Sequence, residues 1–294
     1  MPRFEITMPY YGDVAQMQSA VRSVLAQRGE DWRLTVVDDG REPGVPEWFA
    51  SLGDERVRYF RNPVNLGVTG NFNRCLELAE SEYVVLMGCD DLMHPSYLDV
   101  VRATAEREPK AAMIQPGVEV IGGDGLPYDT LADRTKRRIY APKGPGRALL
   151  GGEDLAVSLL RGNWLYFPSI CWRLDAVRPF GFRADLGVIQ DLALVIDLLV
   201  AGQTLATTPE VCFSYRRHDG SESSATAYTG HRFEEAKRFF RESADRLEAF
   251  GWPAAARVAR LHLSSRLHAL TLLPGAARHA GRPGVSAMLR HAAR

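Results

Sequence analysis

The chain has 294 residues, of which 46% are apolar, so it can bury one large core or a core with an appendage. Lysine plus arginine and aspartate plus glutamate number 36 each, and this balance argues against a nucleic-acid partner. The four scattered cysteines, the absence of a leader-like start and the lack of an apolar run of about 18 residues predict a cytoplasmic protein with reduced thiols and no zinc site.

In the first part of the chain, short apolar runs alternate with segments of helical periodicity, which is typical of a parallel α/β sheet. Between two of these segments, Pro43, Gly44 and Pro46 indicate a turn region. The expected strands are Phe4–Met8, Trp32–Val37, Val57–Phe60, Tyr83–Met87 and Ala111–Gln115, and the expected helices run from about Asp13 to Gly29, from Gly70 to Glu80 and from Pro95 to about Glu108.

Two of the expected strands end in pairs of carboxylates. Asp38 and Asp39 follow the second strand, and Asp90 and Asp91 follow the central strand. The carboxyl ends of strands in an open α/β sheet face the ligand crevice, and paired oxygens there suit Mg²⁺ or Mn²⁺ carrying a phosphate. The alternative is structural, because aspartate also favours turns and helix N-caps. The repetition of the pattern favours a ligand site.

The loop between the two acid pairs, residues 62–74, is dense in turn-forming and amide residues. Asn65, Gly67 and Asn71 lie within it, just before or at the start of a helical segment. Amide side chains both donate and accept hydrogen bonds, so such a loop can bind a polar ligand at many points.

The second part of the chain changes in texture. Residues 131–152 hold a basic run and a stretch rich in proline and glycine, which is compatible with a mobile lid or with a solvated surface loop. A helix from Gly151 to Arg161 follows. Trp164 and Tyr166 come next, and their rings could bind a sugar or an acceptor or could belong to the core. Asp191 then opens an apolar helix, and a strand begins near Thr204.

The final segment differs from the rest in charge. A mixed-charge helix is expected over His231–Phe250, and residues 251–294 contain seven arginines and no acidic residue. A basic helix pair there is compatible with docking on the preceding domain, homodimer packing, an acidic partner or an anionic membrane surface. The last case would place the protein at the inner face of the membrane.

Four motifs together resemble the amino-terminal half of a family 2 glycosyltransferase. They are the opening strand through Tyr11, the Asp38-Asp39-Gly40 turn, Asn65-Leu66-Gly67, and Asp90-Asp91 with Pro95. The resemblance implies a GT-A fold, a Rossmann-like and mostly parallel sheet flanked by helices. It also implies a catalytic domain over residues 1–225, with a nucleotide-sugar half to about residue 125 and an acceptor half after it. Residues 226–294 would form a helical extension.

The resemblance also implies roles for individual residues. Asp191 would be the general base, and Asp90, Asp91 and His218 would hold Mn²⁺ or Mg²⁺. Trp164 and Tyr166 would contact a carbohydrate, lipid-linked or protein acceptor. The expected contacts to the nucleotide-sugar donor are Pro9, Tyr11, Asp38, Asp39, Asn65, Gly67, Asn71, Asp90 and Arg216.

Two departures from the family pattern affect the expected reaction. Gly88 stands where many relatives carry an acid, and Gln190 replaces the first member of an acidic pair. The expected activity is inverting sugar transfer, with UDP the first candidate nucleotide and GDP or dTDP next. A non-catalytic donor-binding relative and a metal-dependent nucleotidyltransferase are the alternatives. No Gly-x-Gly-x-x-Gly follows the first strand, which argues against a nicotinamide-dependent oxidoreductase.

Overall fold

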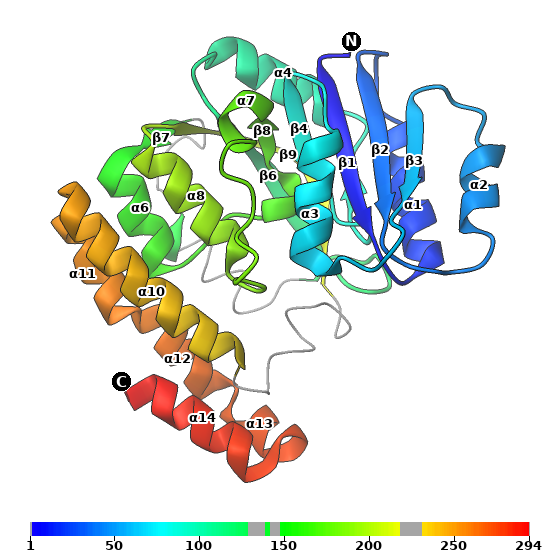
Figure 1. The fold of residues 1–294 in the computed structure, drawn as a ribbon. Helices are drawn as coiled ribbons and strands as arrows, with labels where there is room; N and C mark the ends of the chain where they lie inside the picture. The colour runs from blue at the N-terminus through cyan, green and yellow to red at the C-terminus, as the bar shows by residue number, and fades with distance from the viewer. Residues whose placement is uncertain (1, 129–138, 142–147, 218–230, 294) are drawn as a thin grey trace.

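The computed structural model describes residues 2–128, 139–141, 148–217 and 231–293. This part of the chain forms a nine-stranded sheet with helices on both faces (Figure 1). The strand order is β3-β2-β1-β4-β8-β6-β9-β5, with β7 paired to β9. The strands are β1 (Phe4–Tyr10), β2 (Trp32–Asp38), β3 (Val57–Arg61), β4 (Tyr83–Leu86), β5 (Leu92–Met93), β6 (Met113–Ile121), β7 (Ala148–Gly151), β8 (Cys171–Arg173) and β9 (Thr204–Arg216).

The helices connect these strands in the expected alternation and then form a run of their own at the end of the chain. They are α1 (Val14–Leu25), α2 (Val45–Ser51), α3 (Gly67–Leu78), α4 (Tyr97–Arg107), α6 (Gly152–Arg161), the 3₁₀ turn η2 (Phe167–Ser169), α7 (Leu174–Val177), α8 (Gln190–Val200), α10 (His231–Phe250), α11 (Pro253–Leu261), α12 (Leu263–Thr271), α13 (Leu273–His279) and α14 (Gly281–Ala293). None of these helices is long and apolar enough to cross a bilayer.

The sheet has a parallel half and a mixed half that meet at β4. Strands β3, β2, β1 and β4 pair in parallel, whereas β4 pairs with β8 in antiparallel orientation. Beyond β8, the long parallel ladder between β6 and β9 is flanked by antiparallel partners. The acid pair Asp90-Asp91 therefore follows the strand at which the two halves join, as the sequence predicted, and a mostly parallel α/β fold is confirmed.

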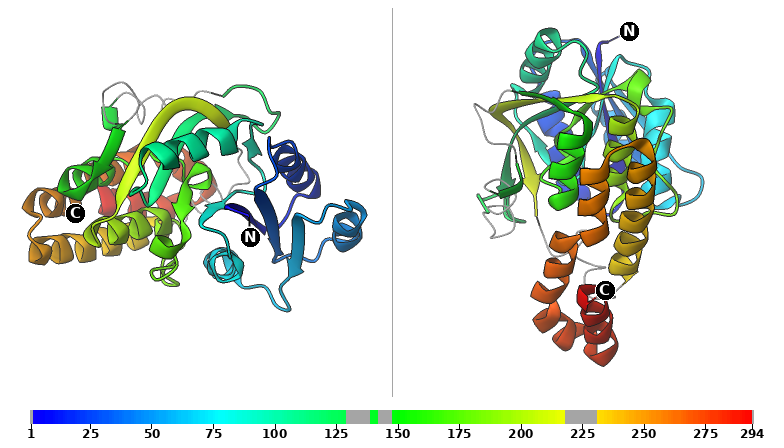
Figure 2. Two further views of the ribbon diagram at one scale, coloured as in Figure 1. Left: turned by 90° about the horizontal axis from the view of Figure 1, so that it is seen from above. Right: turned by 90° about the vertical axis from the view of Figure 1, so that its left-hand side faces the viewer.

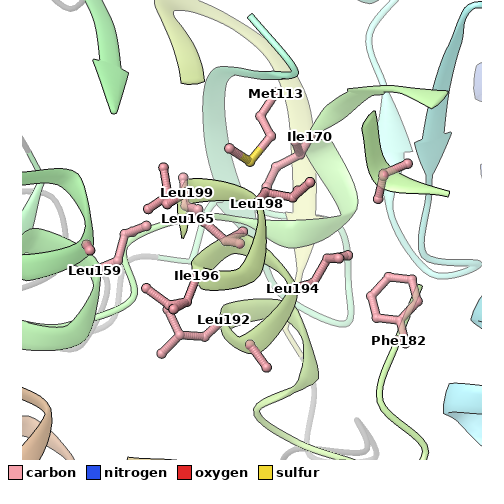
Figure 3. Packing of buried hydrophobic residues seen from close by; sticks show 14 of the residues in the cluster. Met113, Leu159, Leu165, Ile170, Phe182, Leu192, Leu194, Ile196, Leu198 and Leu199 are labelled. Atoms are coloured by element: carbon pink, nitrogen blue, oxygen red, sulfur yellow. The ribbon is translucent and has the colours of Figure 1, made fainter. Parts of the chain in front are cut away.

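The central strand is buried on both faces. Val84 and Leu86 belong to a cluster shared with α3, α6 and α8. Tyr83 and Val85 alternate with them and belong to the cluster on the other face, with α1 and α4. Helix α8 is apolar almost all round because it is enclosed in the first cluster. Figure 3 shows the α8 side chains Leu192, Leu194, Ile196, Leu198 and Leu199 together with Met113, Leu159 and Phe182, which belong to the same cluster.

Two helices of the carboxyl-terminal segment share this core. Phe239, Phe240 and Leu247 of α10, together with alanines of α11, belong to the same buried cluster as α6 and α8. The later helices α12–α14 have a small cluster of their own around Phe233 and Met288. Figure 2 shows α10 and α11 running beside α6 and α8, with α13 and α14 beyond them.

The expectation of two helices after residue 250 was wrong. Four short helices replace the expected pair, because the chain is interrupted at Pro253, at His262 with φ +32°, at Pro274 and at Gly281 with φ +58°. The boundary predicted near residue 226 lies outside the described residues. The basic run Arg134, Lys136, Arg137 and Arg138 and the Pro142–Gly146 stretch lie outside them as well.

Two further local expectations were wrong. The turn region around Pro43 contains helix α2, in which Gly44 adopts φ +76° and Pro46 occupies the first turn, where its missing N–H is not needed. Strand β6 does not end at Gln115 but continues to Ile121. A Cβ on Gly117 would lie 2.5 Å from the carbonyl oxygen of Pro209, so glycine lets the strand pass its neighbour where the pairing shifts register.

Candidate functional site

The first acid of the β2 pair, Asp38, forms its hydrogen bonds within the fold. Asp38 is fully buried, and its Oδ2 accepts hydrogen bonds from the Tyr59 hydroxyl and from Nε of Arg61 at 2.7 Å. Its Oδ1 accepts from the backbone N–H of Gly40 at 2.8 Å. Burial and the Asp38 carboxylate raise the pKa of Tyr59, which keeps its phenol a donor. Asp38 therefore has a structural role at the end of β2, and its contact with a nucleotide base stays a prediction.

The second acid organises the loop that follows β3. Both carboxylate oxygens of Asp39 accept the N–H of Leu66, at 2.8 and 3.0 Å. Oδ1 also accepts from Asn62 Nδ2 at 2.8 Å, and Oδ2 accepts from the N–H of Gly67 at 2.9 Å. Because a carboxylate offers about four acceptor positions, Asp39 is saturated by its own chain. Both oxygens of Asp39 thus hold this loop, and the contact of Asp39 with the nucleotide-sugar stays a prediction.

The amide residues of this loop divide into an inner and an outer set. Asn71 is 3% exposed, donates to the carbonyl oxygen of Val37 and accepts from Asn62, so it has a structural role, and its contact with the donor stays a prediction. Asn65 and Gly67 are exposed, and Asn65 Nδ2 donates to the Asp39 carbonyl oxygen at 3.0 Å. Gly67 adopts φ +70°, a conformation that favours glycine.

The ends of β1 and β4 lie against each other. Pro9 is half-buried near the end of β1, and Tyr11 is 67% exposed just beyond it. The Cys89 thiol lies 4.0 Å from the Tyr11 carbonyl oxygen. Burial raises the pKa of Cys89, with the nearby Asp90 and Asp91 carboxylates as further causes. Tyr11 therefore presents an aromatic ring to solvent beside the second acid pair.

The second acid of the β4 pair, Asp91, is not saturated in the way that Asp38 and Asp39 are. Asp91 is 1% exposed, and its Oδ1 accepts the backbone N–H of Arg216 at 2.8 Å. Its Oδ2 is buried without a hydrogen-bond partner. Burial, followed by the negative charge of Asp90, raises the pKa of Asp91 well above the ordinary value. A buried acceptor without a donor is costly unless something positive reaches it.

Gly88 lies beneath this pair. A Cβ built on Gly88 would be 2.6 Å from Asp91 Oδ2 and 2.9 Å from Asp90 Oδ1, so the two oxygens converge on the space that the missing side chain leaves. Two converging carboxylates fit a hard divalent cation that takes its remaining ligands from phosphates and water. No cluster of three or more metal-ligating side chains occurs among the described residues, and the predicted ligand His218 lies outside them.

Arg216 braces the acid pair from behind. Its Nε donates to the carbonyl oxygen of Asp90 at 2.6 Å, and its Nη1 donates to those of Gly122 and Gly123 at 3.0 and 3.2 Å. The side chain is 8% exposed. Nε and Nη1 of Arg216 therefore hold the backbone around the acid pair, and its contact with a diphosphate stays a prediction.

Asp191 lies in the first turn of α8 and is half-buried. Nδ2 of Asn163 donates to its Oδ2 at 2.9 Å, which fixes one face of the carboxylate. Burial, then the charges of Asp91, Asp90 and Asp191, raises the pKa of Tyr215.

The two aromatic residues expected to contact an acceptor are buried. Trp164 and Tyr166 are each 7% exposed. Trp164 belongs to the main core, and its indole N–H donates to Ser158 Oγ at 3.1 Å. The Tyr166 ring lies 5.4 Å from that of Tyr215. Both rings are therefore packed inside the protein, and their contact with an acceptor stays a prediction.

The role of Asn163 could not be predicted from the sequence. It is separated from Asp191 by 28 positions, and no spacing pattern connects the two. Tyr215 carries no signal of its own in the sequence. Its position near the acid pair depends on the pairing of β9 with β5, because β5 begins directly after Asp91.

Comparison with known proteins agrees with this geometry. A family model described as Glycosyl transferase family 2 matches residues 5–155, just over half of the chain. An uncharacterized protein of Mycobacterium tuberculosis is 25% identical over 222 residues, which cover 74% of this chain and 67% of that protein. The succinoglycan biosynthesis protein ExoO of Rhizobium meliloti is 24% identical over 226 residues, covering 76% and 63%. The chain thus spans about two thirds of the length of these relatives.

Solved structures share the fold at low sequence identity. S. aureus TarS in complex with UDP-GlcNAc has a TM-score of 0.64 and 12% identity, covering 99% of this chain and 89% of that one. The mannosyltransferase PcManGT from Pyrobaculum calidifontis, in complex with GDP-Man and Mn²⁺, has a TM-score of 0.58 and 16% identity, covering 99% and 86%. These structures support the GT-A assignment.

Asp39→Asn should destabilise the fold. The amide replaces one acceptor oxygen by a donor that faces backbone N–H groups, so we expect a loss of about 2–4 kcal/mol in the free energy of unfolding. Urea unfolding measures this loss. The control is Asp245→Asn, because the Asp245 side chain is 84% exposed and its substitution should change stability by less than about 0.5 kcal/mol. Equal losses in the two variants would contradict a central role for Asp39.

Asp91→Asn should have the opposite effect when divalent cations are absent. Because the pKa of Asp91 is raised in the folded chain, ionised Asp91 destabilises folding once the pH exceeds the ordinary aspartate pKa. We expect the variant to be more stable than wild type at neutral pH by about 1 kcal/mol or more, and the difference to vanish toward about pH 4. Melting temperatures with a chelator test this. A variant less stable at neutral pH would show that the charge is compensated.

Proposed function

Because the chain belongs to glycosyl transferase family 2, we propose that it transfers a sugar from a nucleotide-diphosphate sugar to an acceptor hydroxyl with inversion at the anomeric carbon. The observation that carries the proposal is the pair of oxygens of Asp90 and Asp91 that converge over Gly88 after the central strand. This pair would hold a cation for the diphosphate, and Asp191 in the first turn of α8 would be the base for the acceptor.

Asp90 and Asp91 would hold Mn²⁺ or Mg²⁺ through the oxygens that converge over Gly88. When bound, such a cation neutralises the charge that develops on the leaving diphosphate. Arg216 keeps the two carboxylates in place through the Asp90 carbonyl oxygen and the Asp91 carboxylate. These contacts of Arg216 would therefore support the donor site by fixing the acid pair.

Asp191 would take the proton of the acceptor hydroxyl. As the acceptor oxygen forms a bond to the anomeric carbon, the bond from that carbon to the diphosphate oxygen breaks on the opposite face. Asn163 restrains one carboxylate oxygen of Asp191 by its hydrogen bond, which would hold the carboxylate in one orientation for the reaction. A single displacement of this kind needs no covalent intermediate and inverts the configuration.

The nucleotide is proposed from the neighbours and from one exposed ring. TarS was crystallised with UDP-GlcNAc and PcManGT with GDP-Man, so a UDP-sugar is the first candidate and a GDP-sugar the second. Tyr11, exposed beside the acid pairs, is placed to stack on the base. The buried position of Trp164 leaves the acceptor class open to a carbohydrate, a lipid-linked sugar or a protein.

Donor binding with a divalent cation tests the first half of the proposal. A donor at about 100 times its dissociation constant should stabilise the protein by about 2.7 kcal/mol. We expect a thermal shift for one nucleotide class in a panel of UDP-, GDP- and dTDP-sugars with Mn²⁺, and loss of that shift in Asp90→Ala.

Asp191→Asn separates binding from chemistry in the same panel. It should keep the donor-induced shift and lose transfer by about 10²-fold or more, because the base contributes to the transition state alone. Turnover is measured as release of the nucleoside diphosphate with an acceptor library. Donor binding without turnover in wild type would identify a non-catalytic donor-binding relative. The absence of any shift in a folded protein would contradict the donor site itself.

We also infer that the carboxyl-terminal helices attach the protein to an anionic membrane surface. Helix α12 exposes Leu263, Leu267 and Leu270 by 56%, 59% and 42%, at the i, i+4, i+7 spacing of one helix face. Residues 251–294 carry seven arginines and no acid, which complements anionic headgroups. A groove of about 670 Å³ on the neighbouring helices is lined by both apolar and cationic side chains, namely Ala277, Gly281, Arg282, Val285, Ser286, Leu289, Arg290 and Ala293.

Leu267→Ser should weaken binding to vesicles that contain anionic lipid. Burying one leucine contributes about 1.5–3 kcal/mol, so we expect the partition coefficient to fall by about 10-fold or more in cosedimentation. Leu126→Ser is the control, because Leu126 is 63% exposed on a turn far from α12 in the sequence. Equal partitioning of both variants, or a dimer of wild type that Leu267→Ser dissociates, would contradict the membrane assignment.

A further inference from the structure

Helix α10 places a buried carboxylate against the loop that precedes Asp191. Glu235 is 7% exposed and accepts three backbone hydrogen bonds from this loop. Its Oε1 accepts from Val188 at 2.9 Å and from Ile189 at 3.0 Å. Its Oε2 accepts from Gly187 at 3.0 Å. Both oxygens are thus engaged by consecutive amides, 46–48 positions away in the sequence.

These amides need a partner that their own segment does not supply. Helix α8 begins after Ile189, which has no side chain able to cap it. Residues 187–189 directly precede the helix, and the positive end of the helix dipole favours an anion there. Glu235 therefore acts as a cap supplied from another part of the chain. Replacing it would leave three partly buried backbone donors without this acceptor.

The cap lies next to the proposed base. Asp191 is two residues beyond Ile189, in the first turn of α8. Its orientation follows from where that turn begins, because the side chain projects from a backbone whose preceding three amides are fixed by Glu235. Asn163 restrains the carboxylate itself. One contact thus fixes the backbone and the other fixes the side chain.

The same side of α10 carries charged residues that meet the segment on both sides of Asp191. Arg238 donates to the backbone carbonyl oxygen of Asp185 at 2.5 Å, and Glu242 pairs with Arg183 at 2.9 Å. Arg246 pairs with Asp197, one turn and a half beyond Asp191. With Glu235 these residues follow helical spacing. In each of the three ion pairs, Arg183–Glu242, Arg238–Asp185 and Arg246–Asp197, at least one side chain is 38–49% exposed. Exposed pairs contribute little to stability, so their main effect is to fix the position of α10 along the segment.

We propose that Glu235 is a positioning residue for the transfer reaction and acts on Asp191 through the backbone of residues 187–189. The inference rests on the proposed function, in which Asp191 is the base. Glu235 does not touch the substrate and takes no proton. It couples the carboxyl-terminal helices to catalysis, so that α10 belongs to the catalytic unit and is more than an appended helix.

Glu235→Gln in the full-length chain tests this, because glutamine keeps the shape and removes one acceptor oxygen and the charge. The matched control is Glu234→Gln, which neutralises the exposed neighbour on the same helix. We expect amide exchange at residues 187–192 to become about 10-fold faster or more in Glu235→Gln, with no change in the control. This readout does not depend on activity.

The kinetic readout separates positioning from general stability. In Glu235→Gln we expect kcat to fall by about 10- to 100-fold while the donor KM stays within about twofold, because the donor site on β4 is untouched. Faster exchange confined to residues 187–192 together with this split supports the proposal. Unchanged exchange overturns it, as does a parallel change of kcat and KM with exchange raised throughout α8 and α10.

The failure of the proposed function would look different. If wild type bound donor but transferred nothing, or bound no donor, amide exchange would still report whether Glu235 holds residues 187–189. In that case faster local exchange would show that Glu235 holds residues 187–189, and the proposed effect on transfer would be withdrawn. Unchanged local exchange in an inactive protein would remove both.

Discussion

A carboxylate buried at the end of a strand must be compensated, and the way each one is compensated divides this sheet edge into scaffold and site. Asp38 is compensated by Tyr59, Arg61 and a backbone amide, and Asp39 by a side-chain amide and two backbone N–H groups. Asp91 has one backbone donor and one oxygen without a partner. The same residue type in the same strand position therefore builds a loop at β2 and leaves an open acceptor at β4.

The architecture explains why this asymmetry falls where it does. Strand β2 has β3 on one side, where Tyr59 and Arg61 donate to Asp38, and the residues after β3 supply the donors that saturate Asp39. Strand β4 is flanked by β1 and β8, and Arg216 at the end of β9 donates its backbone N–H to Asp91 and its Nε to the Asp90 carbonyl oxygen. Asp91 Oδ2 is left without a hydrogen-bond partner. The site lies where the two halves of the sheet compensate charge least completely.

The sequence predicted the elements well because each rests on local signals. The apolar runs, the acid pairs and Asp13 as the cap of α1 depend on neighbours within a few residues. Which acids are saturated depends on Arg61, Asn62 and Leu66, whose contacts to the pair appear only in three dimensions. For the same reason the sequence could not show that Trp164 is buried, since an aromatic residue in a core and one in a binding site have the same local pattern. Glu235 was invisible because its partners are backbone amides without side-chain identity.

Gly88 ties these observations together. An acid at this position would place its Cβ within 2.9 Å of Asp90 Oδ1 and closer still to Asp91 Oδ2, so the two carboxylates could not converge as they do. The chain therefore has two facing oxygens over bare backbone where a third acid would otherwise stand. With so few protein ligands among the described residues, a cation held there depends on oxygens from a bound diphosphate. It follows that cation and donor would bind this site together, each weakly without the other, and that the departure at Gly88 changes the coupling of the site more than its chemistry.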